Sequence, residues 1–318
     1  MAATLLTDPP GPELAAALTR FERQFSYPLG AVRRFRIDHR GDDRRFFQAL
    51  GEAALAIHAT GDTVHGVIGA ALRGMVAPDG AQRQALYLGD LKISPAARGG
   101  RVLIRLLQQI QAWAGPRAQA AYAIVMDGTA ATPADYTGRL GIPPFRAVAQ
   151  LTLLWLRTAS SKAPADGGAA CHAIAPALGG TLLATLAVGQ HRAAGADSAL
   201  RSQMAPRWLC SQDARACALL EDTRRVKRLV DLAGREMRSA HLSCCAAADA
   251  GSATRLIGHA LHLAGSLGHE LLFVAVASAA APVYQAAFAD RLLALAPATV
   301  YAAGAWAAGP WLISTADI

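Results

Sequence analysis

The sequence predicts an α/β (α+β) protein built from two similar halves, each a mixed, mostly antiparallel sheet flanked by helices. Apolar strand-like runs alternate with amphipathic helices through the first 158 residues, and a fainter copy of that order follows. Between the halves lies ASSKAPADGGAA, a small-residue segment typical of a linker. At 318 residues and 53% apolar residues, the chain is long enough for two domains. We therefore divide it into residues 1–158, 159–170 and 171–318.

The clearest pattern in the chain is ALYLGDLKISPAARGGRVLIRLLQQIQAWA, residues 85–114. Its first part reads as a buried strand that Pro95 ends, because proline offers no N–H to a sheet. After Arg98-Gly99-Gly100-Arg101 comes a helix whose apolar residues recur every three or four positions. Exposed backbone N–H groups at a helix start, together with two arginines, favour an anion such as a diphosphate.

The other elements of the first half are read from the same kind of periodicity. Two helices, a strand and a hairpin around Gly61-Asp62 are expected before that pattern, and two strands and a short helix after it. The ranges are helix 13–25, strand 31–38, helix 42–50, strands 53–59 and 64–75, strand 120–126, helix 133–140 and strand 147–156.

This order, and the motif Ile93-Ser94-Pro95-Ala96-Ala97-Arg98-Gly99-Gly100-Arg101-Val102, resemble motif A of the GNAT (Gcn5-related N-acetyltransferase) superfamily. The segment TPADYTGRLGIPPF, residues 132–145, is similar to that superfamily's motif B. The resemblance implies a cofactor, acetyl-CoA or another acyl-CoA. It also implies the residues that bind the cofactor, which are Leu91, Lys92, Ile93, Arg98, Gly99, Gly100, Arg101 and Val102.

Two residues are candidates for catalysis. Asp90 lies in an apolar strand, where a carboxylate must face a polar cleft or a partner. It is either a general base or anchor for the amine, or a structural partner of Lys92 or an arginine. The resemblance makes Tyr136, on the short helix, the acid that protonates the leaving thiolate, and the alternative is a packing role. His259 and His262 lack a carboxylate or cysteine partner at suitable spacing, so no metal site is expected.

The second half reads as a fainter GNAT copy. We expect a hairpin from strands 216–221 and 228–232, a strand over 238–245, a helix over 253–267, a strand over 271–277, a helix over 282–293 and a strand over 298–302. Its turn carries Asp249 in place of an Arg-Gly pair, and a carboxylate there would repel a diphosphate. The second copy is therefore interpreted as a structural or substrate-side half.

Charge and composition limit the classes of partner that the sequence suggests. The net charge is +8, and eight arginines lie between Arg20 and Arg45, which suits either a solvated surface or a docking face for an acidic acyl carrier protein. Few lysines and no nucleic-acid-binding motif argue against nucleic acid. No apolar run is long enough to span a membrane, no signal peptide is indicated, and the cysteines form no CxxC pair, so a cytoplasmic location is expected.

The sequence thus predicts a tandem GNAT enzyme, an N-acyltransferase, that moves an acyl group, most simply acetyl, from coenzyme A to an amine of a small molecule or protein. Two alternatives stay open. An acyl carrier protein could be the donor, which would use the basic N-terminal segment. Or the chain could be a non-catalytic acyl-CoA-binding or regulatory protein, because Arg101 and Leu103 replace later glycines of the motif.

Overall fold

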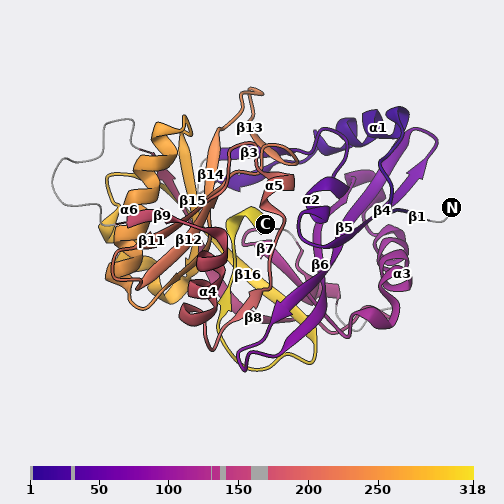
Figure 1. Ribbon diagram of the computed structural model, residues 1–318. Helices are drawn as coiled ribbons and strands as arrows, with labels where there is room; N and C mark the ends of the chain where they lie inside the picture. The colour runs from indigo at the N-terminus through magenta and orange to yellow at the C-terminus, as the bar shows by residue number, and fades with distance from the viewer. Residues whose placement is uncertain (1–2, 30–32, 130, 137–140, 159–170) are drawn as a thin grey trace.

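A single sheet runs through both halves of the chain in the computed structural model, which describes residues 3–29, 33–129, 131–136, 141–158 and 171–318. The strand order along its main path is β1-β4-β5-β6-β7-β16-β8-β15-β14-β12-β11-β9. The first half occupies one side of the molecule and the second half the other, as Figure 1 shows. None of the described helices is long and apolar enough to cross a membrane.

The first half follows the predicted order closely. Its helices and strands are β1 (Thr4–Leu6), α1 (Pro12–Glu22), β2 (Tyr27–Leu29), β3 (Arg33–Asp38), α2 (Arg44–Gln48), β4 (Glu52–Thr60), β5 (Thr63–Val76), β6 (Gln82–Ile93), α3 (Val102–Ala114), β7 (Ala120–Met126) and β8 (Arg146–Arg157). A 3₁₀ turn, η3 (Pro133–Tyr136), stands where a helix over 133–140 was expected; positions 137–140 lie outside the described residues.

The second half contains more elements than its sequence predicts. They are β9 (Cys171–Ile174), α4 (Pro176–Leu186), β10 (His191–Ala193), α5 (Ser198–Arg201), β11 (Arg207–Ser211), β12 (Ala216–Glu221), β13 (Arg228–Asp231), β14 (Ser239–Ala247), α6 (Ala250–Ser266), β15 (Leu271–Ala277), α7 (Ala281–Ala287), β16 (Leu292–Gly304) and β17 (Trp311–Leu312). The expected helix over 282–293 ends at Ala287, because the chain turns at Phe288 and β16 begins at Leu292.

The predicted hairpin between strands 216–221 and 228–232 is wrong. β12 pairs with β11 and β14 in the main sheet, whereas β13 pairs with β3 in a separate three-stranded sheet of order β13-β3-β2. The apolar pattern marked both strands correctly. It could not show that β13 takes its partner from the first half, from Asp38 opposite Arg228 to Phe35 opposite Asp231.

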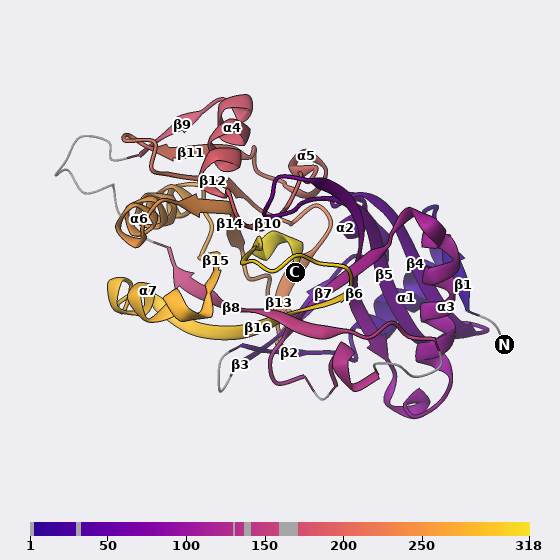
Figure 2. The same cartoon turned by 90° about the horizontal axis from the view of Figure 1, so that it is seen from below.

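The two halves exchange strands at the centre of the sheet. β16 of the second half lies between β7 and β8 of the first and pairs antiparallel with both. β8 in turn pairs with β15 along seven residues. Figure 2 shows β16 and β8 crossing the middle of the molecule side by side. The division of the chain at 159–170 stays a prediction, since that segment lies outside the described residues.

Helices cover both faces of each half. α3 packs with Leu86 and Leu88 on one face of the first half, while α2 packs on the other face with Tyr87. This follows from the alternation of side chains along β6. In the second half α6 and α4 likewise pack into separate apolar clusters, built around Leu242 and Cys217 respectively. The candidate site lies in the first half, between the layers formed by α3 and α2.

Candidate active site

Two neighbouring parallel strands separate at the centre of the first half. β6 and β7 pair only from Leu86 opposite Ala121 to Leu88 opposite Ala123. Beyond that point β6 stays with β5, ending with Ile93 opposite Gly66, and β7 stays with β16. The backbone groups that would join the two strands therefore border an opening in the sheet.

A cavity of about 300 Å³ fills this opening. Leu88–Leu91 and Ala123–Met126 form its two strand walls. Leu103 and Leu107 of α3 reach it from one face of the sheet, and Phe35, Phe46 and other side chains reach it from the opposite face. The cavity therefore passes through the sheet, and its lining is mostly apolar, as in small-molecule sites.

The N-terminus of α3 lies beside this opening and has no cap of its own. Its N-cap residue is Arg101, whose side chain makes no capping hydrogen bond to the first turn. Gly99 has φ +77°, and a Cβ at Gly99 would meet nothing within 4 Å. Arg98, Gly99, Gly100, Arg101 and Val102 thus form an open turn at the positive end of a 13-residue helix; Arg98 N–H donates to Pro95 O, and no acceptor for the other four N–H groups is found among the described residues.

The matching place in the second half is closed. β14 and β15 pair parallel only from Ser239 to His241 and then separate, as β6 and β7 do. Here the last residues of the chain enter the gap: Ser314 Oγ accepts from Cys244 N–H at 2.9 Å, and Thr315 Oγ1 lies 2.9 Å from His241 Nδ1. The N-terminus of α6 is capped by Asp249, whose carboxylate accepts from Ser252 N–H at 2.8 Å. The Asp249 carboxylate thus occupies the start of α6 and would repel a diphosphate there.

Asp90 lies at a bulge in β6, on the edge of the cavity. The register of β5 and β6 shifts between Val67 and Gly69, and Asp90 takes φ +52°, a left-handed conformation that side chains rarely adopt. The bulge turns the carboxylate toward two cations. Asp90 Oδ2 lies 3.2 Å from His39 Nε2, and Oδ1 lies 3.4 Å from Lys92 Nζ. Asp90 is therefore both a structural ion-pair partner and a lining residue of the cavity.

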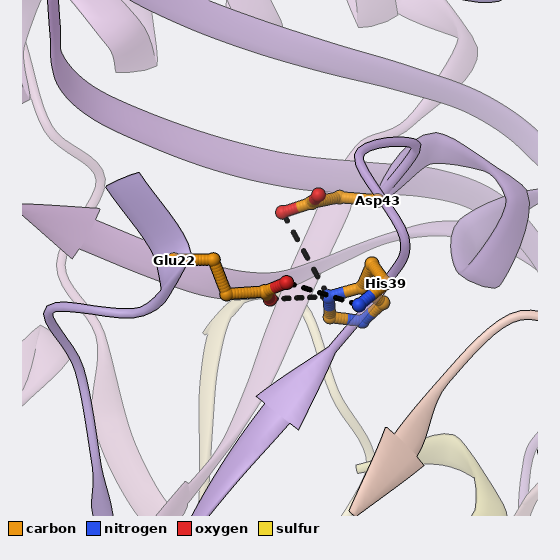
Figure 3. A group of neighbouring side chains, drawn as sticks. All are labelled: Glu22, His39 and Asp43. Carbon is orange, nitrogen blue, oxygen red and sulfur yellow. Dashed lines mark hydrogen bonds and ion pairs between the residues drawn. The ribbon is translucent and has the colours of Figure 1, made fainter. Parts of the chain in front are cut away.

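Behind Asp90 is a buried ionic cluster, which we define as Glu22, His39, Asp43, Asp90 and Lys92. Glu22, at the end of α1, holds His39 at two points: Oε1 lies 2.6 Å from Nδ1, and Oε2 accepts from the backbone N–H at 2.9 Å. Figure 3 shows Glu22 and Asp43 both directed at the His39 ring. The chain of contacts Glu22–His39–Asp90 leads from the interior to the cavity.

Burial and mutual charge decide the protonation of this cluster. Burial would raise the pKa of Glu22, but the charges of His39 and Lys92 outweigh it and hold the pKa well below its ordinary value. Burial opposes protonation of His39 too, yet Glu22 and the two aspartates raise its pKa. For Asp90, burial is again outweighed by Lys92 and His39, which lower its pKa. Burial dominates only at Asp43, whose pKa is raised to about 6.

Three members of the cluster could in principle hold a metal ion. Glu22, His39 and Asp43 each offer one ligand atom, all within 4.8 Å of one another. However, Lys92 Nζ lies 3.0 Å from Glu22 Oε1 and 3.9 Å from Asp43 Oδ2. The ammonium group supplies the positive charge that a cation would bring, and it would repel a second cation at that place.

The other residues predicted for the site differ in how they lie relative to the cavity. Leu91 and Tyr136 both line the cavity. Lys92 is 2% exposed, and its side chain is committed to the ionic cluster. It could therefore contact a cofactor only through its backbone. Ile93 ends β6 and packs toward α3.

The sequence did not single out Glu22, His39 or Lys227. Lys227 lines the cavity, donates to the carbonyl oxygen of Ile318, and has its Nζ 4.2 Å from the centre of the Phe46 ring. Burial lowers the pKa of Lys227 to about 8, although Asp90 opposes this. In the sequence Lys227 lies within the basic run TRRVKR, which looks like a solvated surface. Only the pairing of β13 with β3 brings it inside.

Comparison with known proteins identifies the fold. No protein-family model and no curated protein sequence matches the chain. Three solved structures of Saccharomyces cerevisiae N-myristoyltransferase do match. One, with bound myristoyl-CoA, has a TM-score of 0.60 and 8% identity, covering 95% of this chain and 82% of that chain. A second, also with myristoyl-CoA, has a TM-score of 0.62 and 9% identity, and the match covers 97% of this chain and 80% of that chain. The third, with myristoyl-CoA and inhibitors, has a TM-score of 0.63 and 9% identity, and the match covers 98% of this chain and 82% of that chain.

At this identity the likeness concerns the fold. N-myristoyltransferases have the tandem arrangement of the GNAT superfamily, and this chain has the same fold along nearly its whole length. The expected fold class, a mixed, mostly antiparallel sheet flanked by helices, is thereby confirmed, but one sheet runs through both halves in place of a separate sheet in each.

Proposed function

We propose that the protein is an acyl-CoA-dependent N-acyltransferase. One observation carries the proposal: the opening between β6 and β7 joins an uncapped, basic helix N-terminus to a cavity edged by the carboxylate of Asp90. An anion site, an apolar channel and a carboxylate are what binding an acyl-CoA and an amine together requires. The fold neighbours were solved with myristoyl-CoA bound, which supports an acyl-CoA donor.

The donor would bind from the α3 face. Arg98, Gly99, Gly100, Arg101 and Val102 would hold the diphosphate through backbone N–H groups and the two guanidinium groups. The pantetheine arm would then follow the edge of β6 at Leu91–Ile93, where no strand of the described residues pairs on the side of β7. Lys92 would take part through its peptide group alone.

The acyl group that suits this cavity is longer than acetyl. Leu103, Leu107 and Phe145 line the cavity on the α3 side, and Leu107 and Phe145 belong to or pack against one apolar cluster. An acetyl group would leave most of the 300 Å³ unfilled, and unfilled apolar space loses packing energy. We therefore propose a fatty acyl-CoA as the preferred donor.

In the reaction, the amine nitrogen attacks the thioester carbonyl carbon, the C–N bond forms and the C–S bond breaks. Asp90, ionised and on the cavity edge, would anchor the incoming ammonium group. The oxyanion would be held by backbone N–H groups of the separated β6 edge. The ammonium must first lose a proton, which Asp90 or Lys227, with its pKa lowered to about 8, would accept. Tyr136 would then protonate the thiolate and be reprotonated by the proton that the nitrogen loses as the amide forms.

The test is thiol release from a series of acyl-CoA thioesters mixed with primary amines. We expect release to depend on both substrates and kcat/KM to rise with chain length from acetyl to fatty acyl. Tight coenzyme A binding with no amine-dependent release would instead favour the non-catalytic alternative.

An acyl carrier protein remains an alternative donor, and one observation favours it. Glu22, His39 and Asp43 turn inward to the ionic cluster, whereas Arg23, Arg40 and Arg45 of the same segment are exposed. The outer surface is thus more basic than the sequence count suggests, which suits an acidic partner. Comparing the same fatty acyl group on coenzyme A and on a carrier protein would separate the two donors.

A further inference from the structure

A second hollow, about 510 Å³, lies at the outer end of the candidate site. We call it the arginine groove and define it by its charged lining: Arg33, Arg157, Arg235, Arg238 and Glu270. Four positive charges face one negative charge. Arg235 and Arg238 lie 3.5 Å and 3.9 Å from Glu270. Arg33 and Arg157 are exposed, and no ion pair to either of them is found within the part of the chain that the structure describes.

The groove continues the apolar cavity along two strands. On β3, Ile37 and Phe35 line the cavity and Arg33 lines the groove. On β8, Leu153 lines the cavity, Trp155 lines both, and Arg157 lines the groove. Residues two apart on a strand share a face. On each of these two strands, therefore, the same face carries apolar side chains at the cavity and an arginine at the groove.

Trp155 marks the junction of the cavity and the groove. Its ring contacts Phe35 and Phe273, both of the cavity lining, with ring centres 5.3 Å and 4.1 Å away. It is 3% exposed, and its indole N–H is buried without a hydrogen-bond acceptor among the described residues. Such a donor is costly unless a ligand or water satisfies it.

We propose that the arginine groove binds an anionic group of the acceptor, so that the amines acylated by this protein carry a carboxylate or phosphate remote from the nitrogen. The inference rests on the proposed function and names its acceptor class. Arg33 at the groove and His39 beside Asp90 are six residues apart along β3 and the residue that follows it, which at about 3.3 Å per residue places the groove roughly 20 Å from Asp90. An acceptor of about that length would lie with its ammonium at Asp90, its apolar middle against Phe35 and Trp155, and its anion between Arg33 and Arg157.

The first test measures the anion site without the acyl reaction. Inorganic pyrophosphate is titrated calorimetrically into Arg98→Glu protein, in which the α3 site is impaired. We expect one saturable site, and we expect adding Arg33→Gln and Arg157→Gln to weaken it at least tenfold, since each charge-assisted contact is worth about that much. The control adds Arg146→Gln and Arg207→Gln, exposed arginines outside the groove with the same total charge, and should change affinity less than twofold. Equal losses in the two pairs, or no saturable binding, would overturn the proposal.

The second test measures the acceptor preference. Two C-terminally amidated heptapeptides, six alanines followed by Glu or by Gln, differ only in a charge about 20 Å from the amino group when extended. We expect about a tenfold lower KM for the glutamate peptide at similar kcat, and loss of that preference in the Arg33→Gln/Arg157→Gln protein. Equal KM values in the unmodified protein would contradict the acceptor class. Absence of thiol release with every amine, alongside intact pyrophosphate binding, would reject the acyltransfer and leave the groove as an anion site.

Discussion

Asp90 is the residue whose local conformation best explains a role in the site. A left-handed aspartate in a strand is conformationally costly, and such residues persist where the surroundings hold them in place. Here His39 and Lys92 hold the carboxylate at the cavity edge. We expect Asp90→Asn to lower turnover by about 10²–10⁴-fold while coenzyme A affinity stays unchanged. Asp79→Asn, at an exposed turn, is the control; equal turnover in the Asp90 and Asp79 variants would make Asp90 structural.

The pH dependence of turnover can assign the proton acceptor. The pKa of Asp90 is lowered below its ordinary 3.8, whereas the pKa of Lys227 is lowered to about 8. The acceptor must be in its basic form, so kcat/KM would rise through about pH 8 if Lys227 takes the proton. It would be flat from pH 5 upward if only Asp90 does. We expect the limb near pH 8, and we expect Lys227→Arg to remove it while Asp90→Asn keeps it.

Glu22 and Asp43 provide a matched pair for stability. The pKa of Glu22 is held well below its ordinary 4.5, so its ionisation stabilises the fold above that pH, and this contribution is lost as the pH falls below 4.5. Glu22→Gln leaves His39 and Lys92 under-compensated and should cost about 3–5 kcal/mol in urea unfolding at pH 7. Asp43, whose pKa is raised by burial to about 6, is disfavoured as a carboxylate at pH 7, so Asp43→Asn removes an unfavourable buried charge and should cost about 1 kcal/mol or less at that pH. Equal losses would contradict the proposed charge distribution.

At the scale of elements, the start of α3 differs from the start of α6 in ways that favour one cofactor site. α3 begins uncapped after Arg98 and two glycines, whereas α6 begins with Asp249 already bound to Ser252 N–H and to Arg215. Arg98→Glu should weaken coenzyme A binding tenfold or more, since a charge-assisted contact is worth about 1.5–3 kcal/mol. The matched pair is Arg98→Gln and Gln108→Glu, which change the net charge by the same amount; Gln108 lies on the exposed face of α3. Calorimetry should show weaker coenzyme A binding only for Arg98→Gln.

Local patterns predicted the elements well where each strand could be read by itself. β7, β12 and β15 have the bounds expected from their apolar runs, and the glycine turn before α3 was read from its residues. What failed depended on distant partners. The pairing of β13 with β3, the burial of Lys227 and the contact of Glu22 with His39 join positions 17 to 190 residues apart. Apolar periodicity carries no information about such pairs, so Asp90 was found and the cluster behind it was not.

At the scale of the whole molecule, a buried ionic network fixes the last residues of the chain between the halves. Asp317 Oδ2 accepts from Arg73 on β5 at 2.7 Å, and its Oδ1 accepts from Arg201 of the second half at 2.6 Å. Arg201 is also bound by Glu221. Asp317→Asn would leave two buried guanidinium groups with one carboxylate and should cost about 3–5 kcal/mol. Glu52→Gln, which breaks an exposed pair with Arg117, should cost less than about 1 kcal/mol.

The exchange of strands predicts that the halves do not fold separately. Without β16, β7 loses its antiparallel neighbour, and β8 would keep neither of its sheet partners, β15 and β16. Such unpaired central strands expose backbone groups and apolar surface, so fragments 1–158 and 171–318 should each be insoluble or aggregated when expressed alone. Co-expressed with a tag on one fragment, they should purify together and bind coenzyme A with the affinity of the whole chain. A soluble 1–158 fragment that binds coenzyme A by itself would instead establish an independent first domain, as the linker-like sequence at 159–170 suggests.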